Sequence, residues 1–114
     1  MEAALGEWIR VESVKNQPEV EEVCRAGRLD LGEAEAIVLT QELGAERLLL
    51  DDQRAVSQAR RLGLTVTRTP VIYGEAKLRG WIPSVRHKLD ALRKQGFRLT
   101  DSDYRLVLAK LGEL

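Results

Sequence analysis

The stretch RLLLDDQRAVSQARRLGLTV, residues 47–66, decides the fold class of this chain. Residues 47–50 form a short apolar run that ends in two aspartates, which predicts a buried strand. Residues 52–62 repeat apolar side chains on one helical face, and Gly63 follows as a helix-ending glycine. Residues 64–66 then predict a second strand. This strand–helix–strand order predicts a βαβ unit with parallel strands and a right-handed crossover, and therefore an α/β fold.

Local patterns predict the elements on either side of this unit. Residues 8–14 are rich in β-branched side chains and alternate as a strand does. Helix-start residues, prolines and apolar periodicity predict the remaining helices at residues 17–27, 33–43, 70–79, 83–95 and 100–111. The helix at 33–43 is expected to bury Ala36, Ile37, Thr40 and Leu43, and the last two helices are expected to form a hairpin.

Composition limits the class of protein. With 114 residues the chain is expected to form a single domain over residues 1–114. It has 18 basic and 18 acidic residues, which excludes a uniformly basic nucleic-acid coat. One cysteine and one histidine exclude an internal disulfide and make a zinc cluster a poor interpretation. The chain begins without a basic region followed by an apolar one, so we expect a cytoplasmic protein without a membrane span.

Acidic residues are placed where an α/β fold gathers ligands. Glu33 and Glu35 fall in the first turn of a predicted helix, whereas Asp51 and Asp52 follow a predicted parallel strand. Ligands of open α/β sheets bind outside the carboxyl ends of the strands. Carboxylates at that edge would suit a hard cation such as Mg²⁺ or Mn²⁺, which could activate water against a phosphodiester.

Three of these four residues also have a purely structural interpretation, and for Asp51 the question stays open. Acids in the first turn of a helix complement the helix dipole, which accounts for Glu33 and Glu35. Asp52 can act as the N-cap of the helix that follows it. Basic residues flank the predicted site, and of these we expect Arg54, Arg68 and Lys77 to contact phosphates, although solvated helix faces also account for such residues.

Three motifs carry a resemblance to a known family. They are GEAEAI at residues 32–37, LLLDD at residues 48–52, and a later segment with AK at 76–77, Gly80 and IP at 82–83. Over residues 29–111 the chain resembles a prokaryotic family of predicted nucleic-acid-binding proteins in the PIN-domain superfamily. The resemblance implies a three-layer α/β/α fold with a short parallel sheet, and a metal-dependent ribonuclease. Many such proteins are toxins that an antitoxin protein covers. It also implies that Glu33 and Asp51 or Asp52 hold Mg²⁺ or Mn²⁺, with Glu35 assisting.

The chain departs from the family pattern in two places. Relatives begin with a strand that ends in a metal-binding aspartate, and this chain has no counterpart to it, so we expect a PIN-like domain that lacks the amino-terminal strand and helices. The strand at 47–50 would then have an open edge, which predicts association into an oligomer. After Val66, Arg68, Pro70 and Val71 stand where relatives favour small or apolar residues, two of them glycine, which predicts a disturbed turn.

Two functions remain open from the sequence. The first is a PIN-type ribonuclease in which Glu33, Asp51 and Asp52 are catalytic and, with Glu35, hold the metal. The second is a catalytically inactive PIN-like module that binds a protein or nucleic acid, or that oligomerises. The expected partners are RNA, an antitoxin-like protein and further copies of the chain.

Overall fold

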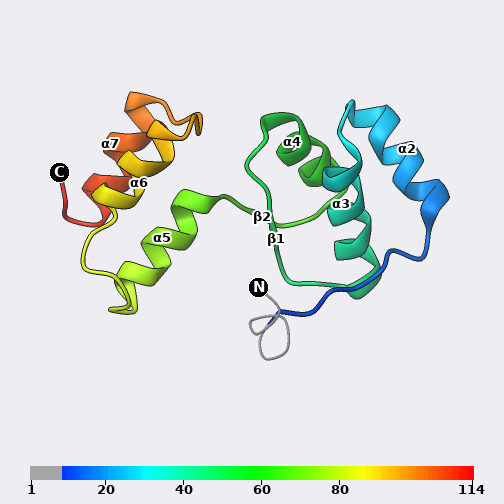
Figure 1. Cartoon of the computed structure of the whole chain (residues 1–114), viewed down its shortest axis with the longest axis horizontal. Helices are drawn as coiled ribbons and strands as arrows, with labels where there is room; N and C mark the ends of the chain where they lie inside the picture. Colours follow the sequence, from blue (N-terminus) through cyan, green and yellow to red (C-terminus); the bar gives the residue numbers. More distant parts are fainter. Residues whose placement is uncertain (1–8) are drawn as a thin grey trace. The chain divides into compact units, whose positions relative to one another are not determined.

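The computed structural model describes residues 9–114, whose helices and short sheet form an α/β fold (Figure 1). The chain divides into two compact units, Met1–Val66 and Thr67–Leu114. The first unit contains α2 (Gln17–Gly27), α3 (Leu31–Leu43), β1 (Leu48–Leu49) and α4 (Gln53–Arg61). β2 (Val66–Thr67) lies at the boundary, and the second unit contains α5 (Thr69–Leu78), α6 (Arg86–Lys94) and α7 (Asp101–Lys110). No described helix is long and apolar enough to span a membrane.

The predicted βαβ unit is present, with α4 between β1 and β2 (Figure 1). The backbone N–H of Leu48 donates to the carbonyl oxygen of Thr65 over 2.9 Å. Leu48 and Leu50 are buried, but Leu49 between them is 54% exposed, so the strand is buried on one face only. The strand pairing confirms the α/β class. The three-layer arrangement stays a prediction, because the sheet has two strands within residues 9–114.

The connection after β2 differs from the disturbed turn that the sequence predicts. Arg68 is extended, with φ −100° and ψ 156°, and Pro70 falls in the first turn of α5. Proline is well suited to that turn because its fixed φ is helical and its missing N–H is not needed there. Among the described residues outside glycine, only Arg28 has a positive φ. The segment therefore needs no glycine, and the predicted disturbance is wrong.

The predicted strand at residues 8–14 is not formed by its described part. Trp8 lies outside the described residues, and residues 9–14 form neither helix nor strand. Val11 is 80% exposed. The segment is held instead at its end, where the Glu42 carboxylate of α3 accepts hydrogen bonds from the backbone N–H groups of Lys15 and Asn16. A strand requires a neighbouring ladder, and β-branched composition alone does not supply one.

The core of the first unit lies between α2, α3, α4 and β1. Its fully buried side chains include Val20 and Val23 of α2, Ile37 and Val38 of α3, and Val56 of α4. The predicted core face of α3 is correct at Ile37 and Thr40 but wrong at its end. Leu43 is 55% exposed, whereas Ala34 is fully buried. The buried face of α3 is therefore centred on residues 34, 37 and 38, which lie on one side of a helix at this spacing.

The second unit contains the helical hairpin that the sequence predicts. Val85, Leu89 of α6 and Leu108 of α7 are fully buried together. α6 begins at Arg86 rather than at residue 83, so the predicted start is wrong by three residues. The reason is a tertiary contact, described below, that caps the helix from another part of the chain.

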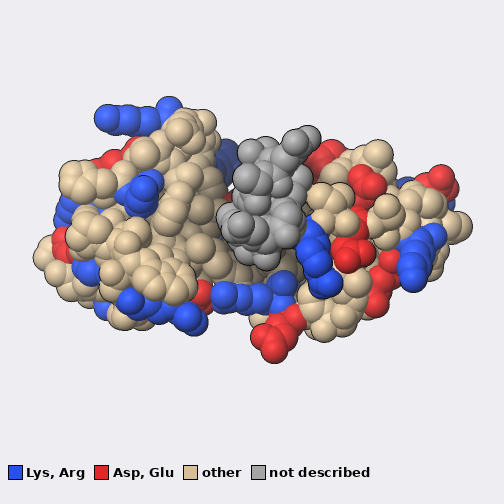
Figure 2. All heavy atoms as spheres, turned by 60° about the horizontal axis from the view of Figure 1, so that its bottom comes forward, with Lys and Arg blue, Asp and Glu red and all other residues tan. Residues whose placement is uncertain are grey.

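The chain has no net charge, but its acidic and basic residues are distributed unequally between the two units. The first has 13 acidic and eight basic residues, and the second has five acidic and ten basic residues. In Figure 2 the first unit shows many acidic side chains among its basic ones, whereas the second shows mostly basic and uncharged side chains on the face in view. A basic unit attracts polyanions even in a chain that is neutral as a whole.

Candidate active site

Glu33 lies in the first turn of α3, where it forms a reciprocal capping box with Asp30. The backbone N–H of Glu33 donates to Asp30 Oδ1 over 2.8 Å, and the backbone N–H of Asp30 donates to Glu33 Oε1 over 3.3 Å. Both bonds satisfy N–H groups that a helix start would otherwise leave without a partner. The spacing of Asp30 and Glu33 is visible in the sequence, so this role could have been predicted there.

Asp52 is the N-cap of α4, as the structural interpretation of the sequence proposed. Its Oδ1 accepts hydrogen bonds from the backbone N–H groups of Arg54 and Ala55, over 3.0 and 3.1 Å. Asp51 is half-buried directly before it, at the end of the strand segment. Both aspartates therefore lie at the carboxyl end of β1, where the βαβ unit predicts them.

Glu33 and Asp52 belong to different helices, and the charge of Asp52 acts on the Glu33 carboxylate. Burial raises the pKa of Glu33 above its usual value, and the negative charges of Asp52 and Asp30 raise it further, against a lowering by the Asp30 backbone N–H. A neighbouring like charge disfavours the ionised form in this way. We refer to Asp30, Glu33 and Asp52 as the acidic group.

Glu35 faces a different part of the first unit. Together with Glu12, Ser13 and Gln17 it lines a separate hollow of about 410 Å³. Residues two positions apart on a helix point to nearly opposite sides, so α3 cannot present Glu33 and Glu35 to one point. The structure therefore directs Glu35 away from the side of α3 on which Glu33 caps the helix start.

The acidic group suits Mg²⁺ or Mn²⁺ in its chemistry but not in its arrangement. Carboxylate oxygens are the hard donors that these ions prefer. Within residues 9–114, however, no three His, Cys, Asp or Glu side chains are grouped so that they could hold a metal ion. In addition, Glu33 and Asp52 are each bonded to backbone N–H groups of a helix start. The described part of the chain thus supplies an incomplete metal site.

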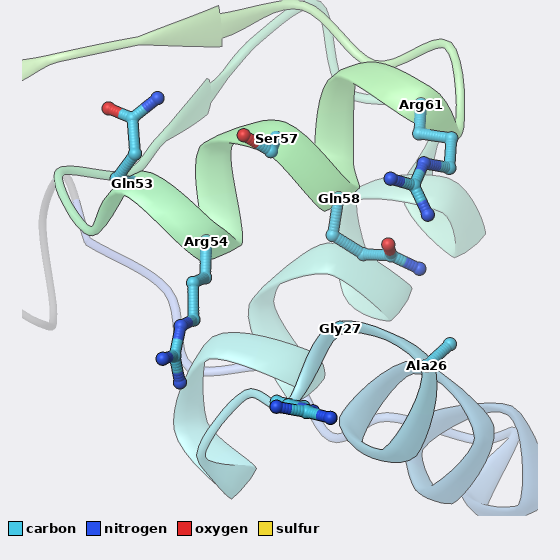
Figure 3. A pocket seen from close by; sticks show the side chains of 8 residues that line it. Ala26, Gly27, Gln53, Arg54, Ser57, Gln58 and Arg61 are labelled. Atoms are coloured by element: carbon cyan, nitrogen blue, oxygen red, sulfur yellow. The ribbon is translucent and has the colours of Figure 1, made fainter.

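Of the three predicted phosphate contacts, only Arg54 belongs to the first unit, where it lines a pocket between α4 and the end of α2 (Figure 3). Arg28 and Arg61 line the same pocket. The sequence offers no signal for this grouping, because Arg28 is 26 positions from Arg54. In the second unit, the Arg68 guanidinium lies over the ring of Phe97, 5.8 Å from its centroid.

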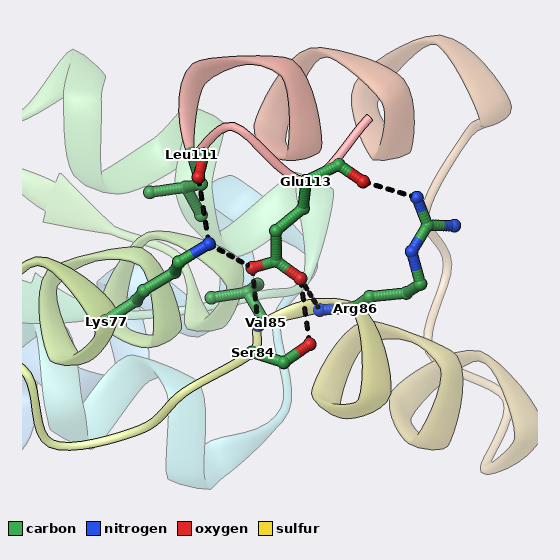
Figure 4. A network of polar contacts seen from close by, with 6 residues as sticks. All are labelled: Lys77, Ser84, Val85, Arg86, Leu111 and Glu113. Carbon is green, nitrogen blue, oxygen red and sulfur yellow. Dashed lines mark hydrogen bonds and ion pairs between the residues drawn. The ribbon is translucent and has the colours of Figure 1, made fainter.

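Lys77, the third predicted phosphate contact, belongs to a network around Glu113 (Figure 4). Its Nζ donates to the Leu111 carbonyl oxygen over 2.8 Å and pairs with Glu113 Oε2 over 2.9 Å. The same carboxylate accepts hydrogen bonds from the backbone N–H groups of Val85 and Arg86 and from the hydroxyl of Ser84. Glu113 thus caps α6 from about 27 residues away, and Lys77 holds it in place.

This network predicts a pH-dependent stability. The Lys77 ammonium, and after it the Val85 N–H, lowers the pKa of Glu113 from 4.5 to about 2. Because the folded state binds this proton less tightly than the unfolded state, the stabilisation is complete above pH 4.5 and is lost as the pH falls toward 2. We expect Glu113→Gln to lower the melting temperature by several degrees at pH 7, measured by circular dichroism.

The expected difference between Glu113→Gln and the unsubstituted protein shrinks as the pH falls from 4.5 to about 2. Glu46→Gln, at an exposed position of the first unit, is the matched control and should leave the melting temperature unchanged at every pH. A constant difference between Glu113→Gln and the original protein across this range would contradict the assignment.

The comparison with known proteins extends over almost the whole sequence. The profile of a family described as a PIN domain matches residues 1–113. No curated protein and no solved structure matches the chain. Because the profile covers nearly every residue, including the acidic group and the βαβ unit, the chain belongs to the PIN-domain family, whose members are nuclease-like modules.

Proposed function

We propose that this protein is a PIN-type ribonuclease that cleaves RNA with the help of Mg²⁺ or Mn²⁺. The observation that carries the proposal is the position of two acidic residues at the starts of two helices that share one core: Glu33 lies in the first turn of α3, and Asp52 is the N-cap of α4. These residues begin two different helices, and Asp52 follows a parallel strand, which is the usual position of a binding site in an α/β sheet.

Glu33, Asp51 and Asp52 are the residues that would hold the ion, with Glu35 as a further candidate ligand. When bound, the ion would supply a more acidic water molecule and neutralise charge on the phosphodiester. Because Glu33 and Asp52 also cap helices, we expect the protein to bind Mn²⁺ only weakly. Their capping bonds compete with the ion for the same oxygen atoms.

The test is an assay of purified protein with single-stranded RNA and Mn²⁺, accompanied by calorimetric titration of the metal alone. Cleavage that requires Mn²⁺ and stops with a chelator supports the proposal. No metal binding at millimolar Mn²⁺ and no cleavage would overturn it. If cleavage is found, a toxin role follows as a proposal, in which an antitoxin-like protein covers the acidic group and growth arrest on expression is relieved by that partner.

The second candidate function is a non-cleaving PIN-like module that binds RNA or protein and oligomerises. The specific observation in its favour is the incomplete metal site within residues 9–114. Binding of RNA without cleavage, at any concentration of Mn²⁺, would favour this candidate over the first.

We further propose that copies of the chain associate through the edge of β1. In the described part of the chain, β1 pairs only with β2, so the other edge of β1 has no partner strand there. Leu49, the second residue of β1, is 54% exposed. Such an edge favours pairing with another chain. Light scattering at micromolar concentration is expected to give at least a dimer, and Leu49→Lys should shift it toward the monomer.

Leu43→Lys is the control for this prediction. Leu43 is 55% exposed, as Leu49 is, but it lies at the end of α3. Its substitution should leave the measured mass unchanged. A monomeric mass for the unsubstituted protein would contradict the association.

A further inference from the structure

A polar pocket of about 310 Å³ lies between the carboxyl end of α2 and one side of α4 (Figure 3). We call it the arginine pocket, because its lining includes Arg28, Arg54 and Arg61. Figure 3 shows the side chains of Arg54 and Arg61 on either side of Gln58, both leaving α4 on the side where Ala26 and Gly27 lie. Ser57 of α4 adds a hydroxyl to the same lining.

Within residues 9–114, no carboxylate forms an ion pair with the guanidinium groups of the arginine pocket. Among the described residues, Arg28, Arg54 and Arg61 take part in no ion pair. The first unit has more acidic than basic residues, yet none of its described acids pairs with these three arginines. Unpaired cations around one hollow attract an anion.

The floor of the pocket is fixed by the close packing of the two helices. A Cβ atom added at Gly27 would lie 3.1 Å from Cγ of Gln58 and 3.0 Å from Cγ of Leu29. Gln58 is itself buried against this glycine. The absence of a side chain at position 27 therefore lets the end of α2 approach α4, and Arg28, the next residue, lines the pocket together with the arginines of α4.

Arg28 occupies a position that favours glycine. It follows the last residue of α2 with φ 54° and ψ 47°, the left-handed conformation at a helix end, and its backbone N–H donates to the Cys24 carbonyl oxygen. Glycine adopts this conformation without steric cost, whereas other residues do so less readily. Helix termination therefore gives no reason for an arginine here, while a role of its side chain in the pocket does.

The arginine pocket and the acidic group share the same two segments of chain. Arg28 precedes Asp30 by two residues, and Arg54 follows Asp52 by two residues. Each segment thus places a cation in the pocket and, within two residues, an anion in the acidic group. The pocket and the acidic group are therefore neighbours along both segments.

We propose that the arginine pocket binds the phosphate groups of an RNA strand and so holds the strand beside the acidic group. Guanidinium groups bind phosphate oxygens by paired hydrogen bonds. A volume of about 310 Å³ leaves room for a ribose attached to the phosphate. The proposal rests on RNA as the ligand in the proposed function, and it is independent of cleavage.

The experiment measures binding of a short fluorescent single-stranded RNA by anisotropy, in EDTA, over a range of salt concentrations. Arg54→Ala and Arg61→Ala are each expected to weaken binding about tenfold, as loss of a charge-assisted hydrogen bond does. The logarithm of the binding constant falls linearly with the logarithm of the salt concentration, and each substitution should make this slope shallower by about 0.7. Arg60→Ala is the matched control, because Arg60 precedes Arg61 on α4 but does not line the pocket.

Arg28→Gly separates binding from folding. Glycine suits the left-handed conformation, so the melting temperature should be maintained while RNA binding falls about tenfold. Equal loss in all four variants, Arg60→Ala included, would show a general charge effect and overturn the proposal. So would binding of inorganic phosphate in the pocket without binding of RNA.

The outcomes also distinguish this proposal from the proposed ribonuclease. If RNA binding depends on the arginine pocket but no cleavage occurs in Mn²⁺, the proposal for the pocket stands and the proposed ribonuclease function is overturned. If Arg28→Gly, Arg54→Ala and Arg61→Ala leave the rate and the KM of cleavage unchanged, the proposed ribonuclease function stands and the proposal for the pocket is overturned.

Discussion

Asp52→Ser is expected to lower Mn²⁺-dependent RNA cleavage by about a hundredfold or more while α4 stays folded. Serine is a good N-cap, so its hydroxyl can replace Asp52 Oδ1 as acceptor for the backbone N–H groups of Arg54 and Ala55. The negative charge is lost, however, and with it a ligand of the proposed ion. Even residues that only orient metal ligands contribute about 10- to 100-fold. The measurements are initial cleavage rates and the melting temperature.

Glu33→Gln tests the other half of the acidic group in the same way. Glutamine can retain the reciprocal bond to the Asp30 backbone N–H, because a capping box accepts either residue. We expect unchanged stability and the same loss of cleavage as for Asp52→Ser. Asp52→Ala, by contrast, should also destabilise the protein by about 0.5–2 kcal/mol, since it removes the cap.

The control for these variants is Asp103→Asn. Asp103 is an exposed acid in the first turn of α7, and the cap there uses its backbone N–H and the Thr100 hydroxyl. Its substitution should change neither cleavage nor stability. Full cleavage by both Asp52→Ser and Glu33→Gln would remove the acidic group from the mechanism and leave the non-cleaving module as the better interpretation.

Ile37→Ala is expected to lower the free energy of unfolding by about 2–5 kcal/mol. Ile37 is fully buried on α3, in the cluster that joins α2, α3, β1 and α4. Truncation to alanine removes buried methyl and methylene groups and leaves a cavity that the packed neighbours fill only in part. Urea unfolding followed by circular dichroism measures the change.

Leu43→Ala provides the comparison on the same helix. Leu43 is 55% exposed, so its truncation should cost less than about 0.5 kcal/mol. Similar losses for Ile37→Ala and Leu43→Ala would contradict the packing described here, because the two residues would then be buried alike.

The helices of this protein could be predicted from the sequence because their ends are local. Asn16, Asp52 and Thr100 each cap the helix that the sequence places after them, through backbone N–H groups two or three residues away. The βαβ unit was equally accessible, since its apolar runs and Gly63 lie within 20 residues. By contrast, the strand expected over residues 8–14 failed, because a strand depends on a partner that local composition does not reveal.

The candidate site could be predicted only in part from the sequence. Acids at the start of α3 and after β1 follow from the pattern of elements, and their proximity follows from the topology of an α/β fold. The opposite direction of Glu35 could have been predicted from helical geometry, but only once the buried face of α3 was known. Arg28 could not have been grouped with Arg54 and Arg61, since nothing in the sequence indicates that α2 ends against α4.

By itself, then, the sequence determined the α/β class, the order of the elements and most helix ends, because those features depend on hydrophobic periodicity and on hydrogen bonds between near neighbours. Only the tertiary structure decided which charges meet. The effect of Asp52 on Glu33, the arginine pocket, and the start of α6 under the Glu113 carboxylate all join residues about 20 or more positions apart. Such contacts depend on how whole helices pack, and packing is decided by the shape of buried side chains rather than by any local pattern.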